Sequence, residues 1–145
     1  MLDKHLNQPW WTLKLAFGLV PIVAGLDKFT NLLTDWTQYL SPLATSVLPV
    51  SAATFMHVVG VIEIAAGLLV LSKFTRLGAY VVMAWLVCIA LNLLSMGRFL
   101  DVAVRDLVMA TGAFTLAKLT EVREGALART GQVSPPLTPK RTATV

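Results

Sequence analysis

Four long apolar stretches dominate this chain, and they limit its possible folds more than any other feature of the sequence. They cover residues 11–33, 53–72, 77–96 and 99–119. A helix needs about 20 mostly apolar residues to cross the hydrocarbon core of a bilayer. Polar and apolar residues do not alternate along these stretches as they would in a membrane-spanning barrel. The sequence therefore predicts an all-α integral membrane protein, a four-helix bundle with four spanning helices.

The composition agrees with a membrane protein. Hydrophobic residues make up 56% of the 145 positions and charged residues only 14%, whereas soluble domains carry roughly a quarter charged residues. The last part of the chain is different, because it is polar and rich in proline and has no long apolar run. We therefore expect a four-span membrane domain over residues 1–122 and a flexible tail over residues 123–145.

The distribution of lysine and arginine predicts the orientation in the membrane. Both ends of the chain are basic, and so is the connection between the second and third stretches, whereas residues 34–52 contain no lysine or arginine. Basic segments stay on the cytoplasmic side. We therefore expect a multi-pass protein of the bacterial inner membrane with both termini and the tail in the cytoplasm. A cleaved signal peptide is an alternative for the first stretch, but the apolar run continues past any cleavage site near Ala24.

The connection between the first two stretches is longer than a tight turn. Trp36, Tyr39 and Leu40 follow one another at near-helical spacing, and Pro42 and Pro49 would end a helix. Tryptophan and tyrosine favour the headgroup layer of a bilayer. We expect a short interfacial segment across the outer mouth of the bundle. It would be either an ordinary membrane anchor or a lid over an outward-facing site.

Cysteine and histidine are too few to form a metal or haem centre from this chain alone. The single cysteine, Cys88, cannot form an internal disulfide, and we interpret it as a small residue packed between helices. The two histidines, His5 and His57, are far apart in the sequence. The sequence also lacks a nucleic-acid motif and a phosphate-binding glycine loop. The expected partners are membrane lipids and either another protein or a second copy of the chain.

Six charged residues interrupt the outer halves of the apolar stretches. A charge at the middle of a span costs roughly 2.5–3.5 kcal/mol. We therefore expect these residues to face one another or water, as a structural ion network inside the bundle. The six residues are Asp27, Lys28, Glu63, Asp101, Arg105 and Asp106.

Helical spacing places the charges on the faces that pack. Residues three or four apart share one face of a helix, and Lys28 follows Gly25 by three positions, as Glu63 follows Gly60. Small residues let membrane helices approach closely. Lys28 and Glu63 should therefore point into the bundle. Asp27 should point about 100° away from Lys28 and reach the outer interface.

The expected ion pairs follow from the depth of each charged residue in the membrane. Arg105 should pair with Glu63 across the bundle, supported by Asp101 one turn earlier on its own helix. Lys28 should pair with Asp106 or with Glu63. Four acids and two bases do not balance, and burial disfavours the charged form of a carboxyl group. Glu63, the deepest acid, should therefore be either bridged to Arg105 or protonated part of the time.

The network has three possible roles. It would hold the four helices together, form a polar pocket for a proton-bearing or redox-active small molecule, or provide a docking surface for another subunit. In the pocket interpretation the candidate catalytic residues are Glu63 and Asp106, as proton carriers. The candidate ligand-binding residues are Lys28, His57, Trp85, Asn92 and Arg105.

Three segments resemble the DoxX-like family of small four-helix membrane proteins. They are "FGLVPIVAGLDKF" (17–29), "GVIEIAAGLLVL" (60–71) and "RDLVMATGAFTLA" (105–117). Their order and spacing carry the resemblance, which covers residues 13–120. The resemblance implies a four-helix bundle. It also places the polar positions of the family on Lys28, Glu63, Arg105 and Asp106.

The resemblance implies a redox association as well. Some members of the family are described as subunits of thiosulfate:quinone oxidoreductase, and others are linked to thiol stress. The chain would then be a membrane subunit linked to a quinone or a sulfur compound, and at most a subunit of an oxidoreductase. We expect no intrinsic cofactor, and a quinone is the redox partner that these residues suit. The alternatives are a non-catalytic structural or assembly subunit of a membrane complex and a small-molecule transporter.

Overall fold

The computed structural model describes residues 4–47 and 49–132 and is all-helical over them. Four long helices are present in this part of the chain: α1 (Lys4–Thr30), α3 (Ala52–Leu71), α4 (Thr75–Met96) and α5 (Leu100–Gln132). A short 3-10 helix, η1 (Trp36–Tyr39), and a short α-helix, α2 (Pro42–Val47), connect α1 to α3. The predicted all-α fold is confirmed, and the short segment lies between the first two long helices as expected.

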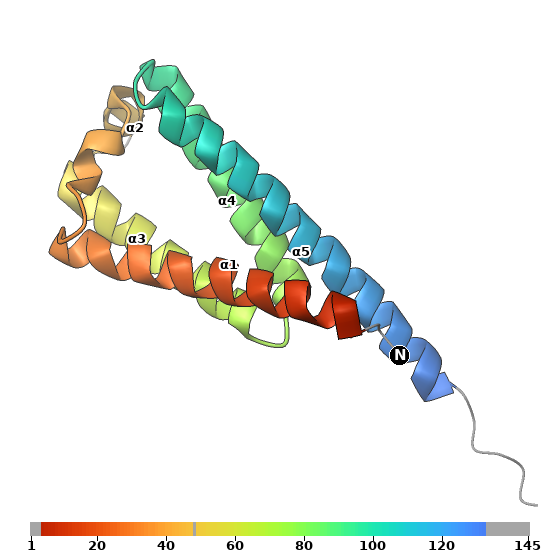
Figure 1. Ribbon diagram of the computed structural model, residues 1–145. Coiled ribbons are helices and arrows are strands. Elements are labelled where there is room, and N and C mark those ends of the chain that lie inside the picture. Colours follow the sequence, from red (N-terminus) through yellow and green to blue (C-terminus); the bar gives the residue numbers. More distant parts are fainter. Residues whose placement is uncertain (1–3, 48, 133–145) are drawn as a thin grey trace, which may run out of the picture.

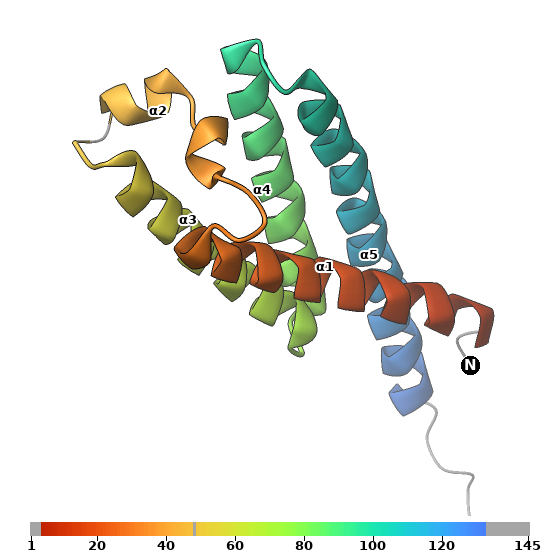
Figure 2. The same cartoon turned by 60° about the vertical axis from the view of Figure 1, so that its left-hand side comes forward.

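The four long helices form two pairs that meet as a V. Helix α1 packs along α3, and α4 packs along α5. The two pairs are closest where α3 leads into α4, and they diverge toward the end that carries η1 and α2 (Figures 1 and 2). The two pairs diverge and do not form a parallel bundle, and this arrangement determines which side chains can meet.

Three of the described helices are long and apolar enough to cross a membrane. They are His5–Thr30, Ala52–Leu71 and Thr75–Met96. Helix α5 differs because Asp101, Arg105 and Asp106 lie near its start. Many large apolar side chains on the outside of the helices are exposed, as lipid contact requires.

Two predicted helix boundaries are wrong. Helix α1 begins at Lys4 rather than at residue 11, and its first turns pack on the neighbouring helix through a 2.8 Å hydrogen bond from the Trp10 indole to Thr120. Helix α5 continues to Gln132, so residues 123–132 of the predicted flexible tail are helical. Alanine, leucine, glutamate and arginine in this segment are strong helix formers, and the prediction gave more weight to polarity. The rest of the predicted tail, residues 133–145, lies outside the described residues.

Glycines bring the backbones of α1 and α3 into contact. A Cβ atom at Gly25 would lie 2.6 Å from the carbonyl oxygen of Gly60, and a Cβ atom at Gly60 would lie 2.6 Å from the carbonyl oxygen of Gly25. Further along the same interface, a Cβ atom at Gly67 would collide with the carbonyl oxygen of Gly18. The small residues beside Lys28 therefore form the packing face, as their spacing predicted.

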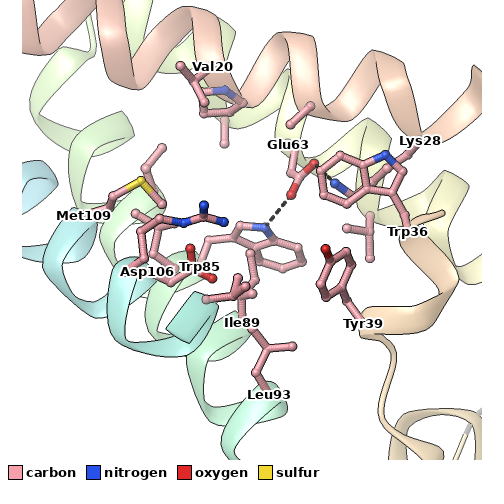
Figure 3. A pocket seen from close by; sticks show the side chains of 18 of the residues that line it. Val20, Lys28, Trp36, Tyr39, Glu63, Trp85, Ile89, Leu93, Asp106 and Met109 are labelled. Atoms are coloured by element: carbon pink, nitrogen blue, oxygen red, sulfur yellow. Dashed lines mark hydrogen bonds and ion pairs between the residues drawn. The ribbon is translucent and has the colours of Figure 1, made fainter. Parts of the chain in front are cut away.

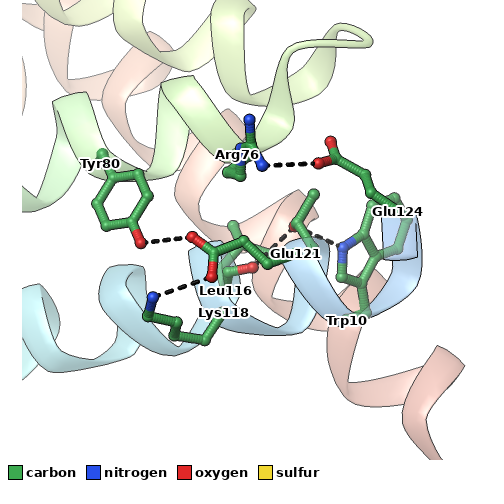
Figure 4. Close-up of polar contacts among 8 residues, drawn as sticks. Trp10, Arg76, Tyr80, Leu116, Lys118, Glu121 and Glu124 are labelled. Atoms are coloured by element: carbon green, nitrogen blue, oxygen red, sulfur yellow. Dashed lines mark hydrogen bonds and ion pairs between the residues drawn. The ribbon is translucent and has the colours of Figure 1, made fainter. Parts of the chain in front are cut away.

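Polar contacts join α4 to α5 near the closed end of the V (Figure 4). The Tyr80 hydroxyl donates to Glu121 over 2.7 Å, and Arg76 lies 3.2 Å from Glu124. The Arg76 and Glu124 side chains are about half exposed, and such exposed pairs contribute little individually. Together with the buried apolar contacts between these helices, they hold the two helices of this pair in register.

Candidate functional site

A cavity of about 710 Å³ lies between the two helix pairs, near η1. Small-molecule sites have volumes of roughly 300–1,000 Å³ and mostly apolar walls with a few polar groups. The wall of this cavity is mostly apolar in the same way. Its charged lining residues are Lys28 from α1, Glu63 from α3, and Arg105 and Asp106 from α5. Charged residues from three helices therefore reach one common space.

Lys28 and Glu63 form a buried ion pair on one side of the cavity. Lys28 Nζ lies 2.6 Å from Glu63 Oε2, and the two side chains are 3% and 9% exposed. The Trp85 indole N–H points to Glu63 Oε1 over 3.5 Å (Figure 3). The close contact of the α1 and α3 backbones puts these two residues next to each other. The alternative prediction that Lys28 pairs with Glu63 is confirmed.

Arg105 does not form the predicted pair with Glu63. Glu63 is paired with Lys28, and Arg105 is exposed, lines the cavity and has no ion-pair partner among the described residues. The reason is geometric, because Arg105 belongs to the other helix pair, which diverges from α1 and α3 at this level. Asp101, which was expected to support Arg105, is exposed and lies outside the cavity lining.

Trp36 covers Lys28. The Lys28 ammonium lies 3.7 Å from the centre of the Trp36 ring, within the range of a cation–π contact. The Trp36 indole donates in turn to Asp27 over 2.7 Å. Trp36 therefore forms part of the cavity wall. Trp36 and Glu63 together contact the Lys28 ammonium.

Asp27 has a different role from the one predicted. It is buried and accepts hydrogen bonds from the backbone N–H groups of Leu32 and Leu33, in addition to the Trp36 indole. Helix α1 ends at Thr30, and the next residue, Asn31, has a left-handed φ of 50°. The Asp27 carboxylate therefore organises the chain that leaves α1; it is buried rather than pointing outward, and it has no ion-pair partner within residues 4–47 and 49–132.

A second anchor holds residues 34–41, the part of the connection between α1 and α2 that we call the strap. Asn92 on α4 donates to the carbonyl oxygen of Tyr39 over 2.7 Å and accepts from the N–H of Ser41 over 3.3 Å. The Tyr39 ring packs on Phe99 with ring centres 4.8 Å apart. The strap thus connects the two arms of the V beside the cavity, as the expected segment across the mouth would. Asn92, predicted to bind a ligand, is outside the cavity lining.

Replacing Asn92 with alanine should loosen the strap. The change removes two hydrogen bonds to the backbone, and the loss of such bonds at a partly buried site costs about 1–3 kcal/mol. Hydrogen exchange measured by mass spectrometry should then speed up in residues 36–41 and stay unchanged at the contact of α1 with α3. Ser46→Ala, on exposed α2, is the control. Unchanged exchange in the strap of the Asn92 variant would show that other contacts hold it.

Asp106 is buried, with 6% of the residue exposed, and it lines the cavity beside Arg105. Within residues 4–47 and 49–132 it has no ion-pair partner. Every fully enclosed side-chain nitrogen or oxygen in that part of the chain does have a hydrogen-bond partner. The Asp106 carboxylate is therefore accessible from the cavity rather than sealed in protein.

Two other predicted features lie away from the cavity. His57 is exposed and stacks on Phe29 with ring centres 4.9 Å apart, outside the cavity lining. Cys88 is exposed, so its predicted position between helices is wrong. Helix α4 packs through Ala79 and Ala90, which are completely buried, and Cys88 is on another face. Among the described residues, no group of three or more histidine, cysteine or acidic side chains could hold a metal ion.

Trp85, a predicted ligand-binding residue, lines the cavity, whereas Trp36 and Tyr39 were predicted only as part of an anchor or a lid and not as lining residues. Trp36 and Tyr39 line it with Trp85, but tryptophan and tyrosine in a connection between spans more often mark the headgroup layer. The sequence offered one signal, because Trp36 and Tyr39 follow soon after Lys28. This closeness in sequence identifies them as cavity-lining residues only when the path of the strap is known.

Comparison with known families identifies one relationship. The family model described as DoxX matches residues 10–98, which is more than half of the chain. The match includes Lys28, Glu63, the strap and Trp85, and it ends before Arg105 and Asp106. Comparisons with curated proteins and with solved structures gave no match.

Proposed function

The chain belongs to the DoxX family, and we propose that it is a redox-associated subunit of the inner membrane that binds a quinone between its two helix pairs. The observation that carries this proposal is the cavity of about 710 Å³, whose mostly apolar wall bears charged groups from both helix pairs. A quinone ring and tail need apolar surroundings, and its carbonyl oxygens need hydrogen-bond donors. The cavity offers both.

The proposed topology has four spans, with α5 as the fourth and both termini in the cytoplasm. Two of the charges of α5 support this proposal because Arg105 and Asp106 line the cavity, and charges in a span are tolerated when they face a cavity. Lys73 lies in the turn between α3 and α4 and Arg76 in the first turn of α4, whereas the strap has no lysine or arginine. By the positive-inside rule, the strap then lies on the outer side of the membrane.

Each proposed role follows from the chemistry of the side chain. Lys28 and Arg105 are cations that can donate hydrogen bonds to the oxygens of the ring. Glu63 and Asp106 are the proposed proton carriers between the ring and the outer side. The aromatic rings of Trp36, Tyr39 and Trp85 would pack against the quinone ring. A partner protein would supply or take up the electrons.

A second candidate function is supported by the ion pair. The pair of Lys28 with Glu63 is buried and links α1 to α3, as expected of a structural or assembly subunit. Under this alternative, substitutions at the cavity change only yield and stability, and the cavity binds no quinone specifically.

Replacing Ala24 with phenylalanine separates the two functions. Ala24 lines the cavity and is half-buried, whereas Ala84 is exposed on α4 and does not line it. Titration of the purified protein with ubiquinone-1 should quench its tryptophan fluorescence in a saturable way, because Trp36 and Trp85 line the cavity. Ala24→Phe should lower the affinity at least about tenfold, a loss of about 1.4 kcal/mol. Ala84→Phe should leave it nearly unchanged.

The same titration can refute the proposal. An absence of saturable quenching in the wild-type protein would remove the quinone site. So would equal affinities of the two phenylalanine variants, since they differ only in whether the ring enters the cavity. Thermal unfolding of both variants checks that each is folded.

A further inference from the structure

The cavity contains an acidic group for which the described residues supply no hydrogen-bond donor. Asp106 is buried apart from 6% of its surface, and its oxygens are accessible from the cavity. A buried carboxylate without hydrogen bonds is costly. A ligand that fits this cavity should therefore bring a donor to Asp106.

Glu63 has spare accepting capacity as well. Its Oε2 atom accepts from Lys28 over 2.6 Å, but among the described residues its Oε1 atom receives only the Trp85 N–H, over 3.5 Å. That distance is long for a hydrogen bond, and each carboxylate oxygen can accept two. Both helix pairs thus present a carboxylate oxygen that a donor could satisfy.

Arg105 provides the complementary group. It is exposed, lines the cavity and has no ion-pair partner among the described residues. An arginine side chain donates hydrogen bonds and cannot accept them. A ligand oxygen beside Arg105 and Asp106 must therefore accept from the first and donate to the second, which a hydroxyl group does and a carbonyl group does not.

We propose that the cavity is built for the reduced, hydroxyl-bearing form of a quinone, and that Asp106 selects this form. The proposal rests on the proposed function, that the cavity holds a quinone-type molecule. One hydroxyl of the quinol donates to Asp106 and accepts from Arg105. The second hydroxyl has Glu63 Oε1 available on the other helix pair. An oxidised quinone satisfies Arg105 and leaves Asp106 without a donor.

The test compares the two redox forms of one probe on the full-length protein. Isothermal titration calorimetry without oxygen would measure the affinities of ubiquinol-1 and ubiquinone-1. The quinol should bind at least about tenfold more tightly, since a hydrogen bond to a charged group is a strong one. In Asp106→Asn the preference should shrink to about twofold, because an amide donates and accepts. Asp101→Asn, the same change at an exposed position outside the cavity, should keep the full preference.

A third ligand tests the proposal without any substitution. The dimethyl ether of ubiquinol-1 keeps the ring and its oxygens but has no hydroxyl protons, so it should bind no more tightly than the quinone. Equal binding of quinol and quinone, or tighter binding of the quinone through a protonated Asp106, would overturn this proposal and leave the quinone site standing. Failure of both forms to bind would instead remove the proposed function.

Discussion

Replacing Lys28 with methionine should destabilise the protein by about 3–5 kcal/mol, because removing one partner of a buried ion pair leaves an uncompensated charge. The Lys28 and Glu63 side chains are 3% and 9% exposed, and Nζ and Oε2 lie 2.6 Å apart. Methionine keeps the length and apolar stem of lysine. The loss should therefore reflect the Glu63 carboxylate rather than an empty space.

A double-mutant cycle isolates this effect. Replacing both Lys28 and Glu63 with methionine should recover most of the lost stability, since a buried ion pair can often be exchanged for apolar residues without loss. Arg76→Met is the matched control, because its pair with Glu124 is about half exposed and should contribute at most about 1 kcal/mol. Unfolding in a detergent mixture of increasing sodium dodecyl sulfate measures the wild type, the Lys28→Met and Glu63→Met single variants, the double variant and the Arg76 control. A Lys28 variant as stable as the Arg76 variant would contradict the buried pair.

Replacing Gly60 with alanine should also destabilise the protein, by about 1–3 kcal/mol, as overpacking does. The added Cβ atom would lie 2.6 Å from the carbonyl oxygen of Gly25. That oxygen is part of the α1 backbone and cannot rotate away as a side chain can. The two helices must separate, and the Lys28 to Glu63 pair between them must lengthen.

Gly125 provides the control for this prediction. It lies in α5, and a Cβ atom there would have no neighbour within 4 Å. Gly125→Ala should leave the stability unchanged or raise it by up to about 1 kcal/mol, because alanine favours helices over glycine. The two glycine-to-alanine changes should thus have opposite signs in the same unfolding measurement. Equal effects would show that α1 and α3 are not in backbone contact.

The sequence allowed one half of the site to be predicted well. Lys28 and Glu63 each follow a glycine by three residues, so helical spacing alone puts each charge on a packing face. Close packing of those faces then brings the two charges together. The apolar stretches likewise predicted the long helices, because the length and hydropathy of a span are local properties of the sequence.

The other half could not be predicted from spacing. Helical phase shows which face Arg105 occupies, but the angle between the two helix pairs decides whether it reaches Glu63. The roles of Asp27 and Asn92 depend on the path that the chain takes from α1 into the strap, which turns at the left-handed backbone of Asn31. A single short turn of this kind has no repeating pattern in the sequence. Asn92 therefore looked like a ligand-binding group and Asp27 like a member of an ion network, although both bind the strap.

The strap connects the fold to the proposed function. Trp36 lies over Lys28 on one side, and Tyr39 packs on Phe99 on the other. Asp27 on α1 and Asn92 on α4 hold the two ends. The strap therefore ties the two helix pairs together beside the cavity, and its Trp36 and Tyr39 side chains form part of the cavity wall.

Photochemical labelling tests most directly whether a quinone occupies the space between the two helix pairs. An azido derivative of ubiquinone-1 would be irradiated with the protein in membranes, and mass spectrometry would locate the attached label. The proposed quinone site predicts labelling of cavity residues such as Trp36, Trp85 and Met109, and its loss in Ala24→Phe. Labelling confined to exposed outer residues such as Val23 and Val61, unchanged by Ala24→Phe, would contradict it.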